Sequence, residues 1–392
     1  MKFATRLLTF DPAPGDRCTP ANTPIYQTAT FRQENATEFG EYDYSRSGNP
    51  TRAVVEKQIA ALENGARGFC FSTGLAAITA VTRLLSPGEE ILACDDLYGG
   101  TYRLFSRILA RRGISVRYVD FTSLDAVASS INPNTRLVYL ESPTNPLLQI
   151  IDIAAVAGIA HGNGSLLCVD NSTMSPYLQR PLELGADIVL HSATKFLCGH
   201  SDVMAGAVVV KDDDLGQELY LIQNGEGAVL SPFDSYLLLR GMKTLSLRLD
   251  RQQANADTLA GLLNAHPAVD HVDFPGLANG EQLRIHRAQA SGNGAVLSFA
   301  TGDAELSRAV VEATKLFAIT VSFGGVNSTI SLPNYMSHAS IPAHLRQQKS
   351  IPADLVRISV GVEDIDDLVD DLSRAFEAAS RQTAVAHAVA AD

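Results

Sequence analysis

The chain has 392 residues, of which 46% are hydrophobic and 19% are charged, and its formal net charge is −12. This length predicts about two to three domains with a sizeable core, and the composition argues against extensive disorder. The negative charge argues against nucleic acid and an anionic membrane as partners, since both bind basic surfaces.

The cysteines are odd in number and show no metal-type spacing; they are Cys18, Cys70, Cys94, Cys168 and Cys198. We therefore expect free thiols, no bound metal and a reducing, cytoplasmic compartment. We also expect no secretory signal, because the first residues lack a long apolar region. No apolar stretch is long enough to cross a bilayer.

The first 50 residues or so are irregular by pattern, because prolines recur and no strong period appears. The stretch YDYSRSGNPT (42–51) is polar and aromatic, with residues typical of turns. We predict that residues 1–55 form an arm laid over another surface and not a domain of their own.

From residue 51 onward, helix and strand patterns alternate, which is typical of βαβ units and a mostly parallel sheet. Predicted helices cover 51–62, 74–85, 101–112, 123–130 and 153–162. Predicted strands cover 68–71, 90–94, 115–119, 137–140, 166–169, 187–190 and 207–210.

The pattern changes after a long helical region at 235–266. Short strands at 269–274, 295–299 and 356–360 then alternate with helices at 304–314 and 364–377. The sequence therefore predicts an α/β fold with a large domain over 56–250 and a smaller C-terminal α/β domain over 251–392.

Three predicted strands of the large domain end in polar side chains. The strand at 187–190 leads into HSATK with Lys195, the strand at 166–169 ends at Asp170, and the strand at 137–140 ends at Glu141 and leads to Asn145. Ligands bind at the carboxyl edge of open α/β sheets. A lysine alone is usually a solvated loop residue, but an amine with a nearby aspartate is the pair that pyridoxal phosphate requires.

A phosphate site is indicated by FSTGLAA (71–77), where Gly74 follows a strand and opens a helix. Backbone N–H groups at a helix N-terminus attract phosphate, although the same residues also suit a simple helix cap. The chain has no GxxxxGK[ST], and no GxGxxG follows a strand, so a nucleotide cofactor and a nicotinamide-dependent oxidoreductase are poorly supported.

Two further side chains suit an amino-acid substrate bound to such a cofactor. Tyr98, in DDLYGGT, can stack on a pyridine ring, although it can equally be a partly buried core tyrosine. Arg357, in VRISVGVED, presents a fork that matches a carboxylate, although it can equally pair with one of the acids that follow it.

Together these stretches carry a family resemblance that runs from about residue 5 to about residue 376. The chain resembles the Cys/Met-metabolism family of pyridoxal-phosphate enzymes, the trans-sulfuration enzymes, in YDYSRSGNPT, LYGGT, YLESPTNP, VDNSTMSPYLQRPLELGADIVLHSATKFLCGHSD, MSHASIP and LVRISVGVED. The resemblance implies the type I, aspartate-aminotransferase-like fold. Within the family, DNSTMSP, HSDVMAG, FDSYLLLRGMKT and SFGGVNSTIS are most similar to the cystathionine β-lyase branch.

The resemblance also implies roles for matching positions. It implies that Lys195 binds the cofactor covalently, that Asp170 pairs with the pyridine nitrogen, and that Tyr98 stacks on the ring and helps to move protons. The remaining implied positions are Gly74, Leu75, Ser192 and Thr194 for the phosphate, Tyr44 and Arg46 for the phosphate in a neighbouring subunit, and Asn145, Ser322 and Arg357 for the substrate carboxylate. The family usually forms homotetramers built as dimers of dimers, so the arm is expected to complete a neighbour's site.

The activity expected from the resemblance is β-elimination of L-cystathionine to homocysteine, pyruvate and ammonia, as in methionine biosynthesis. The alternatives within the family are cystathionine γ-lyase, cystathionine γ-synthase and methionine γ-lyase. Several γ-acting members carry an acidic residue where this chain has Asn327, which favours β chemistry. The sequence leaves the preferred sulfur-containing amino acid open.

Overall fold

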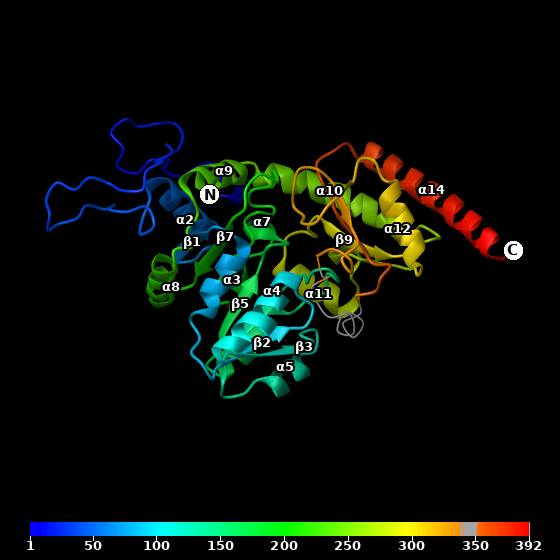
Figure 1. Cartoon of the computed structure of the whole chain (residues 1–392), viewed down its shortest axis with the longest axis horizontal. Coiled ribbons are helices and arrows are strands. Elements are labelled where there is room, and N and C mark those ends of the chain that lie inside the picture. Colours follow the sequence, from blue (N-terminus) through cyan, green and yellow to red (C-terminus); the bar gives the residue numbers. More distant parts are fainter. Residues whose placement is uncertain (338, 340–350, 392) are drawn as a thin grey trace.

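The computed structural model describes residues 1–337, 339 and 351–391, and within this part of the chain two β-sheets pack with helices around them (Figure 1). The larger sheet has the strand order β1-β7-β6-β5-β4-β2-β3, and the smaller has the order β10-β11-β12-β9-β8. Most of the stretch MSHASIP (336–342) lies outside the described residues.

The larger sheet is mostly parallel, as predicted. The pairs β2–β3, β2–β4, β4–β5 and β5–β6 are parallel, and β7 runs antiparallel to β6 and β1. Its strands are β1 (Arg67–Phe71), β2 (Glu90–Cys94), β3 (Ser115–Val119), β4 (Thr135–Glu141), β5 (Leu166–Asp170), β6 (Ile188–His191) and β7 (Gly206–Val210).

Helices pack around this sheet and connect it to the second one. They are α1 (Phe3–Arg6), α2 (Pro50–Glu63), α3 (Gly74–Thr82), α4 (Gly99–Arg103), α5 (Leu124–Ser130), α6 (Ile153–Gly162), α7 (Ser175–Leu178), α8 (Asp213–Glu226), α9 (Pro232–Met242) and α10 (Leu245–Asn264). The elements that surround the larger sheet also include a π-helical turn, η1 (Leu104–Ile108), and two 3₁₀ turns, η2 (Leu109–Arg112) and η3 (Pro181–Leu184).

Local chemistry explains where α2 and α3 begin. The side chain of Asn49 accepts hydrogen bonds from the first backbone N–H groups of α2, and Pro50 occupies the first helical turn, where no N–H is needed. Thr73 caps α3 in the same way by accepting from Ala76 N. The strands β5, β6 and β7 are almost wholly apolar and buried, as expected for strands covered on both faces.

The smaller sheet has a core of its own. Its strands are β8 (His271–Asp273), β9 (Val296–Ala300), β10 (Ala318–Ile319), β11 (Thr329–Ser331) and β12 (Val356–Ser359), and the remaining helical elements are η4 (Pro275–Leu277), α11 (Gly280–Gln289), α12 (Ala304–Ala313) and α14 (Ile365–Ala391). Phe299, Ile358 and Leu372 are among the fully buried residues that join this sheet to α10, α12 and α14. Figure 1 shows α12 and α14 side by side at one end of the molecule.

Several predicted elements differ from the structure in extent. The helix predicted at 101–112 begins at Gly99 and changes to π and 3₁₀ geometry after Arg103. The helical region predicted at 235–266 is interrupted at 243–244, and α8 and α11 lie where no helix was predicted. Helix α10 runs through residue 250 and connects the two sheets, and the domain limits at 55/56 and 250/251 stay predictions.

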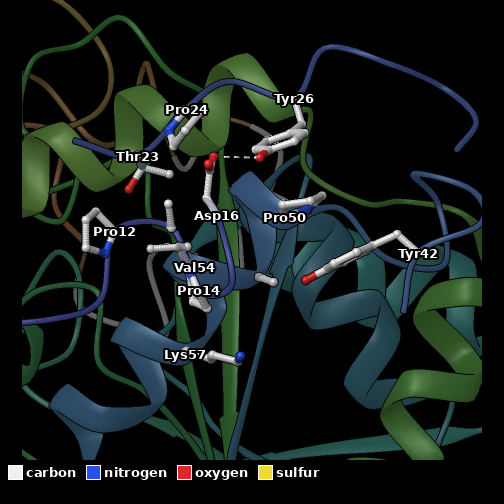
Figure 2. Close-up of a pocket in the computed structure, with 12 residues that line it drawn as sticks. Pro12, Pro14, Asp16, Thr23, Pro24, Tyr26, Tyr42, Pro50, Val54 and Lys57 are labelled. Atoms are coloured by element: carbon white, nitrogen blue, oxygen red, sulfur yellow. Dashed lines mark hydrogen bonds between the residues drawn. The ribbon is translucent and has the colours of Figure 1, made fainter. Parts of the chain in front are cut away.

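The predicted arm, residues 1–55, includes α1 and the start of α2, and residues 7–49 between them are irregular, as the sequence predicted. Figure 1 shows the loops of this segment projecting beside α2, and its assignment as an arm stays a prediction. Figure 2 shows where the arm packs on α2: the Tyr26 hydroxyl donates a hydrogen bond of 3.0 Å to Asp16 above Val54 and Lys57. The small cavity at this contact has a volume of about 30 Å³. Its lining includes none of the predicted site residues, so it is not the predicted active site.

All five cysteines are free, and all but Cys18 are buried. Among the residues that the structure describes, no helix combines the length and apolarity that a membrane span needs. The same residues contain no cluster of three or more His, Cys, Asp or Glu side chains suited to a metal ion.

Candidate active site

The ends of β4, β5 and β6 bring the predicted polar residues to one edge of the larger sheet. In the strand register, Glu141 lies opposite Asp170, and Asp170 lies opposite Leu190. The loop with Lys195 begins one residue after β6 ends at His191. The three strand ends therefore meet as the sequence predicted, at the edge where α/β sheets bind ligands.

Lys195 follows β6 and contacts the loop that precedes β11. Its Nζ donates a hydrogen bond to Ser322 Oγ and lies 5.0 Å from the centre of the Phe323 ring. Burial and, to a smaller extent, the charge of Arg357 lower the pKa of Lys195 to about 8, although Asp170 opposes the shift. An amine with this pKa is partly unprotonated near neutral pH, which a nucleophile or a general base requires.

The loop that meets Lys195 has a backbone shaped for close approach. Ser322 has φ of +84°, a left-handed conformation that is unusual for serine and that costs of order 1–3 kcal/mol. Gly324 has φ of +86°, and a Cβ there would lie 2.7 Å from Phe196 N and 2.9 Å from Lys195 C. Any other residue at 324 would push the loop away from Lys195.

Asp170 is buried at the end of β5 and is held by three hydrogen bonds. Its Oδ1 accepts from Ser172 N at 3.0 Å and from Ser172 Oγ at 2.5 Å, and its Oδ2 accepts from the Tyr139 hydroxyl at 3.2 Å. Burial raises the pKa of Asp170, whereas the Ser172 hydrogen bonds and the charge of His191 lower it. None of the ion pairs among the described residues includes Asp170, and a buried carboxylate of this kind is suited to a protonated ring nitrogen.

The N-terminus of α3 forms a cradle beside the Lys195 loop. A Cβ on Gly74 would lie 3.0 Å from both Cβ and Oγ of Ser192, so glycine keeps this space open. The Ser192 hydroxyl has no hydrogen-bond partner among the described residues, and the amides of Gly74 and Leu75 stand in the first turn of the helix. This combination suits a phosphate.

Thr194 is partly engaged elsewhere. Its hydroxyl donates to Ala205 O at 3.2 Å and accepts from Ala205 N at 2.9 Å. A hydroxyl has one proton to donate. An anion at Thr194 would therefore compete with the Ala205 carbonyl, and its phosphate role stays a prediction.

Tyr98 is available at the sheet edge, with 40% of its surface exposed. Its backbone N–H donates to Glu141 Oε1 at 2.9 Å, which ties the turn before α4 to the end of β4. A Cβ on Gly100 would lie 2.4 Å from the Tyr98 ring, so the ring lies directly over that glycine. The site therefore presents an aromatic face suited to stacking.

Arg357 is a buried cation, and none of the ion pairs among the described residues includes it. Its guanidinium donates to Asn145 Oδ1 and to Ser322 O, both at 2.8 Å, and lies 5.4 Å from the centre of the Phe323 ring. Burial lowers the pKa of Arg357 to about 10. A desolvated guanidinium with only neutral acceptors favours an anionic ligand, and a carboxylate matches its fork.

The alternative in which Arg357 pairs with a following acid does not occur. Glu363 accepts two hydrogen bonds from Ser328, and Asp364 lies 3.8 Å from Arg251. Arg357 is therefore in direct contact with both of the other predicted carboxylate-binding residues, Asn145 and Ser322.

Tyr44 and Arg46 are not part of this cluster within one chain. Among the described residues, their side-chain contacts are with each other and with Asn224 of α8. Arg52 holds this segment by donating to the carbonyl oxygens of Ser45 and Arg46, at 2.6 and 3.1 Å. The structure thus shows two exposed side chains on an anchored loop, and their phosphate role stays a prediction.

Three residues near the site were not among those predicted. Ser172 and Tyr139 hold Asp170, and Phe323 packs against both Lys195 and Arg357. The Asp-x-Ser spacing of 170–172 is typical of a local turn that bonds the aspartate. Tyr139 and Phe323 have no comparable signal, because a buried strand tyrosine and a loop phenylalanine are common in any core.

These groups fit pyridoxal phosphate: a phosphate cradle at Gly74, an aromatic face at Tyr98, an amine at Lys195 and a buried carboxylate at Asp170. The family model for Cys/Met metabolism PLP-dependent enzymes matches residues 4–377. The chain is 55% identical to the chloroplastic cystathionine beta-lyase of Arabidopsis thaliana, over 91% of this chain and 77% of the relative.

Other similar proteins differ in their named reactions. The cystathionine beta-lyase of Bacillus subtilis is 49% identical over 91% of each chain. The crystal structure of a cystathionine gamma-lyase from Lactobacillus plantarum superposes with a TM-score of 0.93 at 43% identity, covering 97% of this chain and 100% of that one.

Proposed function

Because the chain belongs to the Cys/Met metabolism PLP-dependent enzyme family, we propose that it is a carbon–sulfur lyase acting on L-cystathionine. The products are homocysteine, pyruvate and ammonia, and one water is consumed. The observation that carries the proposal is Lys195, a partly unprotonated amine beside the Arg357 guanidinium, which is buried and whose hydrogen-bond partners among the described residues are neutral.

The cofactor supplies one function, which is to withdraw electrons from the substrate Cα when it is bound. Four groups of the protein would hold it. The amides of Gly74 and Leu75 and the Ser192 hydroxyl would bind the phosphate, Tyr98 would stack on the ring, Asp170 would pair with the ring nitrogen, and Lys195 would hold the aldehyde carbon covalently. The buried Asp170 carboxylate has its two oxygens fixed by Ser172 and Tyr139, so its orientation is set before the cofactor arrives.

The substrate is oriented through its carboxylate. Arg357 binds the two carboxylate oxygens, and Asn145 and Ser322 hold the guanidinium in place. A bound carboxylate fixes the position of Cα relative to Lys195, so that the Cα hydrogen faces the amine.

Lys195 then moves protons. Its Nζ, when it is not bonded to the cofactor, would take the Cα proton as a general base. The Cβ–S bond breaks with its electron pair leaving on sulfur, and Lys195 or the Tyr98 hydroxyl returns a proton to that sulfur. General acid–base steps of this kind contribute about two to four powers of ten each.

The γ-acting reactions of the family are the nearest alternative, because a cystathionine gamma-lyase of Bacillus subtilis is 47% identical over 93% of this chain. Two relatives named cystathionine beta-lyase rank with higher identity, at 55% and 53%. Asn327 adds support for β-elimination, since it replaces an acidic residue of several γ-acting members.

Product analysis with purified protein and L-cystathionine tests the proposal. We expect pyruvate and homocysteine, and the purified protein should carry a visible absorbance that borohydride fixes on Lys195. The appearance of 2-oxobutanoate and cysteine instead would establish the γ reaction. A panel of cystine, cysteine and other thioethers would then define the preferred substrate.

We propose further that the protein is a cytoplasmic homotetramer, a dimer of dimers in which Tyr44 and Arg46 reach the neighbouring subunit's phosphate. The anchored loop with two exposed side chains supports the shared site, and the five free cysteines support a reducing compartment. Mass photometry tests the assembly. Mixed assemblies of Arg46→Ala and Lys195→Ala chains should regain activity only if the sites are shared.

A further inference from the structure

Helix α10 carries a row of buried polar side chains, Arg248, Gln252 and Asn255, which we call the polar row. The three residues are spaced by four and three positions, so they lie on the same face of the helix. They are 5%, 0% and 1% exposed. Among the described residues, none of their hydrogen bonds reaches a predicted site residue, so the mechanism above leaves the polar row unexplained.

The first residue of the polar row holds the segment that carries Lys195. The Arg248 guanidinium donates hydrogen bonds to Leu197 O at 3.4 Å and to Gly241 O at 3.0 Å. Leu197 lies two residues after Lys195. A Cβ on Gly199 would lie 2.0 Å from Arg248 Nη1, so the guanidinium lies directly over this turn. The helix is therefore fixed against the Lys195 segment.

The second residue, Gln252, holds both segments of the predicted carboxylate site. Its Nε2 donates to Gly325 O at 2.8 Å and to Val360 O at 2.9 Å. Both partners are carbonyl oxygens, so the nitrogen of the amide must face them, and its two protons are both used. Gly325 belongs to the loop of Ser322, and Val360 follows the strand of Arg357. One amide therefore joins the two segments to α10.

The third residue and the loop backbone complete this arrangement. Asn255 Nδ2 donates to Gly361 O at 3.1 Å and to Glu363 O at 2.9 Å, which fixes the chain after β12. The Gly324 N–H donates to Ser359 Oγ at 2.8 Å, which joins the loop to β12 itself. One helix face therefore contacts every segment that supplies a predicted group for the substrate side of the site, apart from the end of β4.

The Gln252 amide is an expensive group to bury. Its Oε1 is buried and has no hydrogen-bond partner among the described residues. An apolar side chain of the same length would fill this position without leaving an acceptor unpaired. A buried amide that makes two directed bonds fixes the geometry of its partners more than it adds stability.

We propose that Gln252 is a positioning residue, which holds the Ser322 loop and the Arg357 strand at the distance from Lys195 that a substrate α-carboxylate requires. The inference rests on the proposed binding of that carboxylate by Arg357. Arg248 ties the Lys195 segment to the same helix, so the amine and the guanidinium are placed by one rigid element. Loss of the Gln252 amide releases the loop and the strand end together and leaves the contacts of the cofactor groups in place.

The test compares L-alanine with ethylamine as ligands of the holoenzyme. The two amines differ only in the α-carboxylate, and neither carries a leaving group that could be eliminated. Calorimetry gives the dissociation constant of each amine, and the ratio of the two constants is the readout. Gln252→Met keeps the length of the side chain and removes both donors.

The matched control is Gln58→Met. Gln58 is also a buried glutamine, 5% exposed, and its Nε2 donates a hydrogen bond of 2.7 Å to the backbone carbonyl of Arg6 in α1. It lies in α2 and bonds to none of the three segments that α10 holds. A purely structural loss would lower the thermal stability of both variants and leave the ratio of dissociation constants unchanged in both.

The wild type should prefer L-alanine by roughly a hundredfold, because a carboxylate forms charge-assisted hydrogen bonds to a guanidinium fork. Gln252→Met should lose about tenfold of this preference through weaker binding of L-alanine, with ethylamine within about twofold. Its kcat/KM for L-cystathionine should fall between about ten- and a hundredfold, since a misplacement of about 1 Å from a distant mutation can cost this much. Cofactor content and visible absorbance should stay normal, and Gln58→Met should keep the wild-type ratio.

A Gln252→Met holoenzyme with the wild-type ratio would overturn the inference. If this variant does not fold, Gln252→Asn, which keeps the amide on a shorter side chain, decides the question by the same ratio. A wild type that binds both amines equally would overturn the carboxylate role of Arg357 and this inference with it. A wild type that prefers L-alanine but forms 2-oxobutanoate from cystathionine would change the proposed function alone, since the ratio involves no elimination.

Discussion

Replacing Arg357 with methionine removes the buried guanidinium and keeps a side chain of similar length. In the proposed complex the lost interaction is a pair of charge-assisted hydrogen bonds to the substrate carboxylate. Hydrogen bonds to charged groups contribute about 1.5–3 kcal/mol each. A total loss of about 3 kcal/mol corresponds to roughly two powers of ten in kcat/KM, and we expect most of it as a higher KM.

The same substitution has a second consequence at Lys195. The charge of Arg357 is one of the causes that lower the Lys195 pKa to about 8, so its removal should raise that pKa. The apoenzyme would then combine with pyridoxal phosphate more slowly at pH 8, because less of the amine is unprotonated. Arg357→Lys separates the two effects, since lysine keeps the charge near Lys195 and loses the fork that binds a carboxylate.

Two assays read these outcomes: initial rates of keto-acid formation over a range of cystathionine concentrations, and the pH dependence of cofactor uptake by the apoenzyme. An unchanged KM in Arg357→Met would refute the carboxylate role of Arg357. An uptake profile that does not move to higher pH in Arg357→Met would refute the electrostatic coupling between the two side chains.

Three further substitutions test separate parts of the site. Lys195→Met should abolish turnover. It should also stabilise the apoenzyme at pH 7 by up to about 3 kcal/mol in urea unfolding, because the pKa of Lys195 is about 8 in the folded state and about 10.4 in an unfolded chain. The stability of the wild type should rise with pH between these two pKa values. A variant that is still more stable than the wild type at pH 11 would contradict this explanation. Gly74→Ala should weaken cofactor binding about tenfold, since its Cβ would lie 3.0 Å from Ser192, whereas Gly158→Ala, in the open middle of α6, should leave binding unchanged. Tyr98→Phe keeps the stacking face and loses the hydroxyl, so kcat should fall by up to about a hundredfold with normal cofactor binding; an unchanged kcat would remove Tyr98 from the proton transfers.

Pattern and composition were sufficient for the strands that build the site. Residues 166–169 and 188–190 are continuous apolar runs, which indicate buried strands, and the polar residues that follow must then lie at one edge because parallel strands end on the same side. The helix N-terminus at Gly74 was predictable for the same local reason, since Thr73 provides the cap.

Tertiary structure decided which of the alternatives for each side chain is realised. Arg357 lies 212 residues from Asn145, so no local pattern could show that the two side chains are in contact or that the acids after Arg357 have other partners. Gln252 and Val360 show the same limit, because α10 and the end of β12 meet only in the folded core. Periodicity and capping act over a few residues and therefore specify elements. The lowered pKa of Lys195 and the buried charge of Arg357 arise from groups that folding brings together from distant parts of the chain.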